Sequence, residues 1–188
     1  WHGNHKTGQG YSTPCTTYNC LKVPIYKGGA AQIAKMIRTV NPGGGTHLDS
    51  AMRIASKYYK NTTYSPIDKK LDCQNSYVIL IGDGDWFRHT HTRGLKIVKD
   101  LFNNHKIKTF SIAFGTGISG NGYRYFQDVA KAGGTGKSIV ATTGASLTAQ
   151  LKAKIGEIIA EKLSFTAPAI TATIEKGGSL YQAQFDYQ

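Results

Sequence analysis

The stretch YVILI at residues 77–81 decides the fold. It is a continuous apolar run rich in β-branched residues, with no polar residue at alternate positions. Runs of this kind are typical of strands that are buried on both faces of a parallel sheet. We therefore predict a buried strand here, as part of an α/β domain.

Strand-like and helix-like segments alternate outward from this run. Further strands are predicted at LKVPIY (21–26, an edge strand because of Pro24), IKTFSIAF (107–114) and KSIVAT (137–142). Helices are predicted at 29–40, 46–59, 92–104, 122–132 and 145–163. This order predicts an α/β fold: a doubly wound, mostly parallel sheet flanked by helices on both faces.

The ends of the chain differ in character from this middle part. Residues 1–20 are polar and irregular, residues 21–163 form the α/β domain, and residues 164–188 read as a C-terminal β-hairpin turning at Lys176-Gly177-Gly178. The chain opens on Trp1 without a signal-peptide pattern, so we expect it to be a piece of a longer protein. No run of 18 apolar residues occurs, and a transmembrane segment is not expected.

The chain is strongly basic, with 23 Lys and Arg against 11 Asp and Glu, a net charge of +12. That charge favours anionic partners such as nucleic acid, acidic glycans or lipid headgroups. Most of the lysines, however, are scattered singly, and none form long blocks. A generally basic surface is therefore favoured over a dedicated polyanion site.

Three cysteines are present, and two of them lie close together in the polar loop TPCTTYNC. Cys15 and Cys20 are read as a disulfide, which indicates an oxidising compartment. Cys73 then has no known partner. The alternative is that Cys73 pairs with one of the other two and leaves a different thiol free.

The stretch KAGGTGKSIV (131–140) ends like a nucleotide-binding P-loop, with Gly136-Lys137-Ser138. A P-loop follows a strand and precedes a helix, so that amide groups face the phosphates. Here a predicted helix precedes the glycines and a strand follows them, and Lys131 stands where the first glycine belongs. Gly133-Gly134 are read as a helix C-cap, and an NTPase is disfavoured.

Ligands of doubly wound sheets bind beyond the carboxyl ends of the strands. Two segments bring oxygen ligands to that edge: GGGTHLD carries Thr46 at a helix start, and VILIGDGDW carries Asp83 after a strand. A hydroxyl and a carboxylate suit a hard cation such as Mg²⁺ or Ca²⁺. The plain alternatives are a helix N-cap for Thr46 and a turn residue before Gly84 for Asp83.

The succession of NPGGGTHLDSAMRIASKYY, YVILIGDGDW, IKTFSIAFGTG and FQDVAKAGGTGKSIVAT resembles a von Willebrand factor A (vWA) domain over residues 21–163. SPIDKKLDCQNSYVILIGDGDW and the tail GGSLYQAQFDY more narrowly resemble the PilC/PilY family of type IV pilus tip adhesins. That resemblance implies that the tail leads into a further C-terminal domain outside this chain.

The vWA resemblance implies a metal-ion-dependent adhesion site built from Asp-x-Ser-x-Ser, a threonine and an aspartate. Thr46 and Asp83 match the second and third parts, and Asp49 or Asp85 would act through water. Gly82 stands where the family pattern has Thr or Ser. No Asp-x-Ser-x-Ser occurs in the 188 residues, so the strand that carries it is expected upstream or in a separate chain.

The PilC/PilY resemblance implies a non-enzymatic module for adhesion and pilus assembly, extracellular at the bacterial pilus tip. Its partners would be minor pilins, missing segments of the same protein, and a host or surface receptor whose acidic group completes a cation's coordination. The alternative function is a basic module that binds DNA, an acidic glycan or an anionic surface. A metal-dependent hydrolase that uses the Asp83 loop ranks third.

The loop after Asp83 supplies a candidate contact rim, whose members are Trp86, Arg88, His89, His91 and Arg93. His89-x-His91 has the spacing of two adjacent imidazoles that bind Zn²⁺ or Ni²⁺, although solvated loop histidines are the favoured interpretation. No Ser/His/Asp or Cys/His catalytic arrangement is supported.

Overall fold

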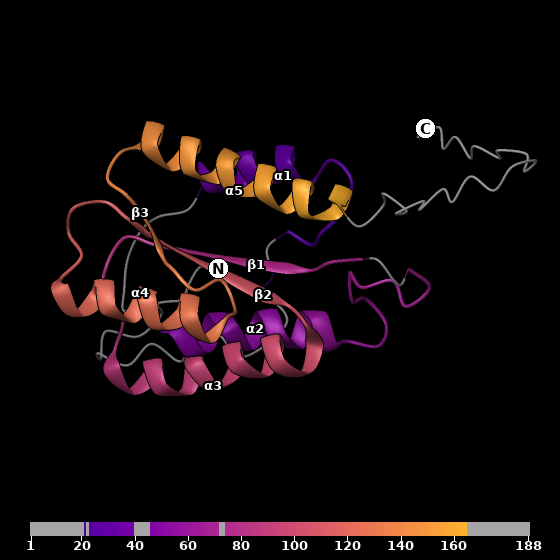
Figure 1. Cartoon of the computed structure of the whole chain (residues 1–188), viewed down its shortest axis with the longest axis horizontal. Coiled ribbons are helices and arrows are strands. Elements are labelled where there is room, and N and C mark those ends of the chain that lie inside the picture. The colour runs from indigo at the N-terminus through magenta and orange to yellow at the C-terminus, as the bar shows by residue number, and fades with distance from the viewer. Residues whose placement is uncertain (1–20, 22, 40–45, 72–73, 165–188) are drawn as a thin grey trace, which may run out of the picture. The chain divides into compact units, whose positions relative to one another are not determined.

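The computed structural model describes residues 21, 23–39, 46–71 and 74–164 (Figure 1). Its elements in chain order are α1 (Gly29–Ile37), α2 (Leu48–Lys60), β1 (Tyr77–Gly82), α3 (Arg88–His105), β2 (Lys108–Phe114), α4 (Gly120–Ala132), β3 (Ile139–Ala141) and α5 (Gly144–Ser164). The three cysteines, the segment 1–20 and the hairpin predicted for the tail lie outside the described residues. The chain divides into two compact units, Trp1–Gln150 and Leu151–Gln188.

The sheet of the first unit has three strands in the order β1-β2-β3, and both pairs are parallel. Ile79 lies opposite Phe110 and Ile81 opposite Ile112, which in turn lies opposite Ile139. α3 connects β1 to β2, and α4 connects β2 to β3. The predicted α/β class with a parallel sheet is therefore confirmed, in a Rossmann-like arrangement.

One face of the sheet carries the main hydrophobic core. Val78 and Leu80 of β1 pack against a cluster that includes Val98 and Leu101 of α3 and Phe126 of α4, all three fully buried. Gly82 continues this face, and a Cβ added there would lie 2.9 Å from the Phe126 ring. The ring occupies the space that a Thr or Ser side chain would need, so packing explains the glycine.

The opposite face of β1 differs from the prediction. Ile79 is 42% exposed and Ile81 is 47% exposed, whereas Ile112 on the neighbouring strand is 1% exposed. The expectation that YVILI is buried on both faces is thus wrong for β1. An apolar run shows that both faces can be buried, but the neighbouring elements decide whether they are.

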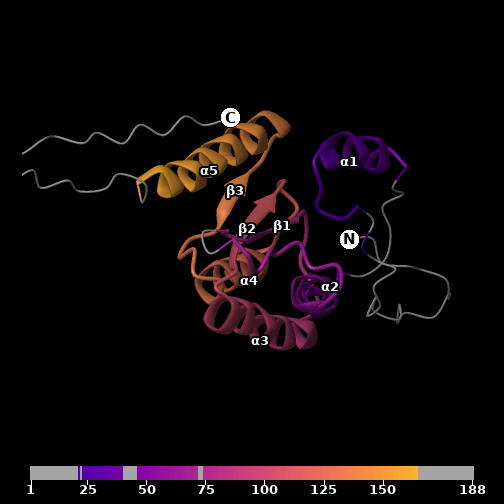
Figure 2. The ribbon, with the colours of Figure 1, turned by 90° about the vertical axis from the view of Figure 1, so that its right-hand side faces the viewer.

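α2 packs closely along α3 on the core side (Figures 1 and 2). A Cβ added to Gly94 of α3 would lie 2.5 Å from Leu48 Cγ, so the two helices approach each other at a residue without a side chain. At the far end of this pair, Lys60 Nζ donates to Asp100. That hydrogen bond, followed by one from Asn104, holds the pKa of Asp100 below its usual value.

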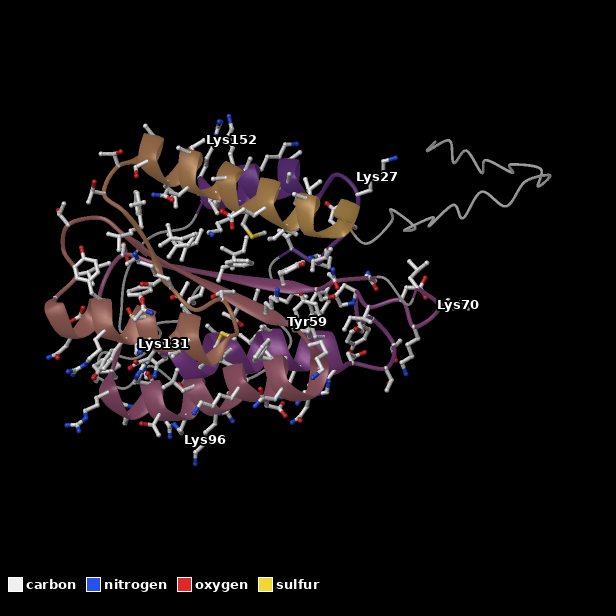
Figure 3. All side chains as sticks on the ribbon, viewed as in Figure 1. Lys27, Tyr59, Lys70, Lys96, Lys131 and Lys152 are labelled. Carbon is white, nitrogen blue, oxygen red and sulfur yellow. The ribbon has the colours of Figure 1, made fainter. Side chains whose placement is uncertain are left out.

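Tyr59 anchors the end of α2 to the start of β1 (Figure 3). Its hydroxyl donates to the Tyr77 carbonyl at 2.7 Å, and the side chain belongs to the core. Burial raises the pKa of Tyr59 to about 12, and the neighbouring Tyr58 adds to the shift. Tyr59 is therefore neutral across the physiological range.

Three local predictions need correction. LKVPIY is not a strand in its described residues; the Ile25 amide instead donates to the Tyr58 hydroxyl at 2.9 Å. α3 begins at Arg88, four residues earlier than predicted, which places His89 and His91 on a helix and not in a loop. The N-cap of α2 is His47, not Thr46, and the Thr90 hydroxyl accepts from the Leu48 amide at the helix start.

The glycines after α4 are arranged as predicted. Gly133 is the C-cap of α4, and Gly134 adopts a φ of 75°, a left-handed conformation that favours glycine. β3 follows them. Because the helix precedes the glycines, their amides do not form the strand–loop–helix cradle of a P-loop.

Candidate functional site

Three loops meet at the carboxyl edge of the sheet. The segment before α2 joins the β1–α3 loop, since the Phe87 amide donates to the Thr46 carbonyl at 3.2 Å. The β2–α4 loop joins it from the other side, since the Ser119 amide donates to Asp85 Oδ1 at 3.1 Å. The segment that carries Thr46 and the loop that carries Asp83 are therefore in direct contact at this edge.

Thr46 and Asp83 present free oxygen atoms at this edge. Both residues are exposed. Within the described part of the chain, neither the Thr46 hydroxyl nor the Asp83 carboxylate makes a hydrogen bond or an ion pair. Because His47 serves as the α2 N-cap, the Thr46 hydroxyl is not used by the helix. Both groups are available to a ligand.

Asp85, two residues further along, has a structural role. Its two carboxylate oxygens accept from the amide and the hydroxyl of Ser119. Ser119 in turn caps α4, because its hydroxyl accepts from the Gly122 amide at 3.1 Å. A Cβ on Gly122 would lie 1.9 Å from Asp85 Oδ1, so the carboxylate fills the space beside this glycine. Asp85 thus fixes the β1–α3 loop to the start of α4.

Asp49 is engaged in holding α2 to α3. The side chain is 2% exposed, and Oδ2 lies 2.9 Å from Arg93 Nε and 3.7 Å from Arg53. The other oxygen, Oδ1, is buried and has no hydrogen-bond partner. The carboxylate lies three residues from Thr46, but its charge is already matched by two guanidinium groups.

Trp86 and His91 lie in the core and not on an exposed rim. The Trp86 indole N–H donates to His91 Nδ1 at 3.1 Å, and His91 Nε2 lies 3.2 Å from Asp128 Oδ2. Nδ1 must accept, so the proton sits on Nε2 and points at Asp128. Tyr125 stacks on the imidazole with ring centroids 4.1 Å apart. Both ring nitrogens are occupied, so His91 is not placed to bind a metal with His89.

The exposed part of the predicted rim consists of Arg88, His89 and Arg93, and Phe87 joins it. Phe87 is 45% exposed and stacks on the His89 ring at 5.7 Å, with His47 edge-on at 5.1 Å. An exposed aromatic ring beside cationic groups suits a contact surface. This rim borders the loop that carries Asp83.

The sequence did not reveal the hydrogen-bond and stacking partners of the candidate site residues. These partners decide which side chains have a structural role and which are free to bind a ligand. Ser119 had a visible signal, because a serine three residues before Gly122 at a helix start is a typical N-cap. Tyr125 and Asp128, the partners of His91, had none, because they come from a helix 34 or more residues away. Within the described segments, no group of three or more His, Cys, Asp or Glu is arranged to hold a metal.

The sequence matches no protein-family model and no curated protein. In the described part of the chain, no helix is both long enough and apolar enough to cross a membrane.

Proposed function

We propose that this chain is a vWA-like binding module that engages an acidic group of a partner at the carboxyl edge of its sheet, through a divalent cation. One observation carries the proposal: the Thr46 hydroxyl and the Asp83 carboxylate are exposed and unpaired on two loops joined by the Thr46–Phe87 hydrogen bond. Other acidic groups of the edge, Asp49 and Asp85, are tied to protein partners.

The cation, Mg²⁺ or Ca²⁺, would take Thr46 and Asp83 as two of its oxygen ligands. Two protein ligands leave coordination positions of the cation open for water and for a carboxylate of the partner. When bound, the cation supplies the positive charge that an acidic partner recognises. Thr46 and Asp83 would position the cation, and Asp85 keeps the β1–α3 loop in place.

The test is titration calorimetry of the protein with Mg²⁺, Ca²⁺ and Mn²⁺. Thr46→Val and Asp83→Asn are expected to weaken binding at least tenfold each, about 1.4 kcal/mol. Asp68→Asn is the matched control, because Asp68 is an exposed carboxylate in the loop between α2 and β1. Equal affinity in all four proteins would refute the cation site.

The biological setting that the resemblance supports is the type IV pilus tip, with a role in adhesion and pilus assembly and no enzymatic activity. The order of the vWA-like and PilC/PilY-like motifs along a parallel α/β sheet supports this setting. The native particle, isolated under non-reducing conditions, would be analysed for every chain it contains. Minor pilins are expected in it, and a particle that contains no pilin would contradict the assignment.

A second candidate, polyanion binding, is favoured by the net charge of +12. Lys96 on α3 and Lys131 on α4 are exposed and project from the helices (Figure 3). Binding to heparin that falls steeply with salt and is unchanged by a chelator would support this candidate. Binding that is abolished by a chelator at constant ionic strength would support the cation site.

A further inference from the structure

The exposed Lys, Arg, Asp and Glu residues of α2 and α3 all carry positive charge. Three residues of α2 are exposed, and all three are cations: Arg53, Lys57 and Lys60. The exposed cations of α3 are Arg88, Arg93, Lys96 and Lys99. The carboxylates of these two helices are less accessible, because Asp49 is buried and Asp100 is half-buried.

The other described helices do not concentrate positive charge in this way. α1 has a single lysine. On α4, the half-buried Asp128 lies between the exposed Arg124 and Lys131, and on α5 Lys154 donates to Glu157 at 2.6 Å. Mixed signs of this kind are usual on a solvent-exposed helix. The scatter of the lysines along the sequence therefore conceals a cationic surface that forms only when α2 packs on α3.

The cations of this surface form two rows. α2 lies along α3, because Leu48 at its start meets Gly94 and Lys60 at its end donates to Asp100 (Figure 1). Packed helix axes lie about 8–10 Å apart, and each row is about 6–9 Å long at 1.5 Å per residue. Lys60 is matched by Asp100, and Arg88 lies about 140° around α3 from Arg93. The remaining five residues are named the basic face: Arg53, Lys57, Arg93, Lys96 and Lys99.

A buried carboxylate positions one guanidinium from each row. Asp49 Oδ2 lies 2.9 Å from Arg93 Nε and 3.7 Å from a terminal nitrogen of Arg53. The two arginine side chains nevertheless stay 55% and 44% exposed. A guanidinium has five N–H donors, so contact with one carboxylate oxygen leaves donors for a ligand. Planar donor pairs of this kind match the oxygens of a phosphate group.

The basic face is polar throughout. Neither α2 nor α3, both of which lie wholly within the described residues, exposes a large apolar side chain. Insertion into a lipid surface needs such side chains, and so does the core of a protein–protein interface. Single-stranded nucleic acid needs aromatic rings on which its bases stack. Partners of these three kinds are therefore disfavoured.

Two rows of cations suit a partner with two rows of anions. Double-stranded DNA carries about one phosphate per 3.4 Å of axis on each strand. The strands border a minor groove about 6 Å wide and a major groove about 12 Å wide, and the separation of the helix axes lies between these widths. Each row can thus meet the phosphates of a different strand. An acidic glycan or peptide is a single chain and would match one row at a time.

We propose that the basic face binds the phosphate backbone of double-stranded DNA without reading its bases. The inference rests on the second candidate function, polyanion binding, and names its surface and its partner. Each cation that meets a phosphate releases counterions, which gives a slope of about −0.9 per contact in log affinity against log salt. The five residues of the basic face therefore predict a slope of about −4.5.

The test is fluorescence anisotropy of a labelled duplex of about 20 base pairs with the 188-residue chain, in EDTA and about 50 to 200 mM NaCl. Lys57→Gln with Lys96→Gln is expected to reduce the slope by about 1.8 and to weaken binding at least tenfold at about 0.1 M salt. Lys70→Gln with Lys137→Gln is the matched control, because both lysines are exposed on loops away from α2 and α3. It is expected to change affinity less than about twofold. Circular dichroism checks that both double variants are folded.

Several results would overturn the proposal. Equal losses in the two double variants would show that charge acts without a defined surface. A single strand of the same sequence bound as tightly as the duplex would remove the role of two rows. A heparin fragment bound where the duplex is not would overturn the proposal and leave the polyanion candidate standing, whereas binding of neither would remove both. Cation titration without DNA tests the Thr46–Asp83 site separately.

Discussion

Replacing Asp85 by alanine should destabilise the protein without touching the exposed oxygens of the site. The substitution removes the acceptor of two hydrogen bonds from Ser119 and takes a negative charge from the start of α4. Hydrogen bonds to charged groups contribute about 1.5–3 kcal/mol, less when exposed, and a charge near a helix N-terminus about 0.3–1 kcal/mol. Because Asp85 is exposed, we expect a total loss of about 2 kcal/mol.

The assay is urea denaturation followed by circular dichroism, with the midpoint and slope fitted separately. For a protein of this size, the expected loss corresponds to a fall in melting temperature of about 4–8 °C. Asp85→Asn keeps one acceptor oxygen and is expected to lose about half as much. Asp83→Asn on the same loop is the control, and its stability should stay within about 0.5 kcal/mol of the parent.

Two outcomes would refute this account of the loop. Asp85→Ala within about 0.5 kcal/mol of the parent would show that the link to Ser119 contributes little. Asp83→Asn as destabilising as Asp85→Ala would show that Asp83 has a structural partner. Either result would remove the distinction between a structural and an available carboxylate on which the site rests.

Two further perturbations test the packing. The pKa of Tyr59 is raised to about 12, so its contribution to stability is complete below about pH 10, the value in the unfolded chain, and is lost as the pH rises toward 12. Tyr59→Phe should flatten the alkaline part of a stability–pH curve, and an unchanged slope would contradict the assignment. Gly94→Ala places a Cβ 2.5 Å from Leu48 Cγ and should cost about 1–3 kcal/mol in urea denaturation, whereas Gly120→Ala, with open space around it, should change little. Equal effects would argue against a tight α2–α3 contact.

The sequence was informative wherever periodicity and local signals decide structure. β1, β2 and the helices α2 to α4 follow from apolar spacing, and the glycines after α4 follow from the rule that helices end in left-handed glycine. The strand predicted at LKVPIY was wrong, because an apolar hexapeptide forms a strand only where another strand pairs with it. The local sequence does not show whether such a partner exists. The hydrogen bond of Ile25 to Tyr58, 33 residues away, replaces the expected sheet pairing.

The roles of the candidate site residues were harder to predict than the helices and strands, because the type of a residue does not reveal its hydrogen-bond partners. Asp83 and Asp85 are the same amino acid two positions apart, yet only Asp85 meets Ser119, which lies 34 residues further on. His89 and His91 form a metal-like spacing, yet the helix turns them apart and His91 is held by Trp86. Long-range contacts of this kind decide which polar groups remain available, and no local pattern encodes them.

The carboxyl end of β1 and the free oxygens of the site belong to one region. Asp83 follows the carboxyl end of β1, and Thr46 precedes α2, which Figure 2 places on the same side of the sheet. Because the Phe87 amide donates to the Thr46 carbonyl, a change that shifts the start of α2 should also move the Thr46 hydroxyl relative to Asp83.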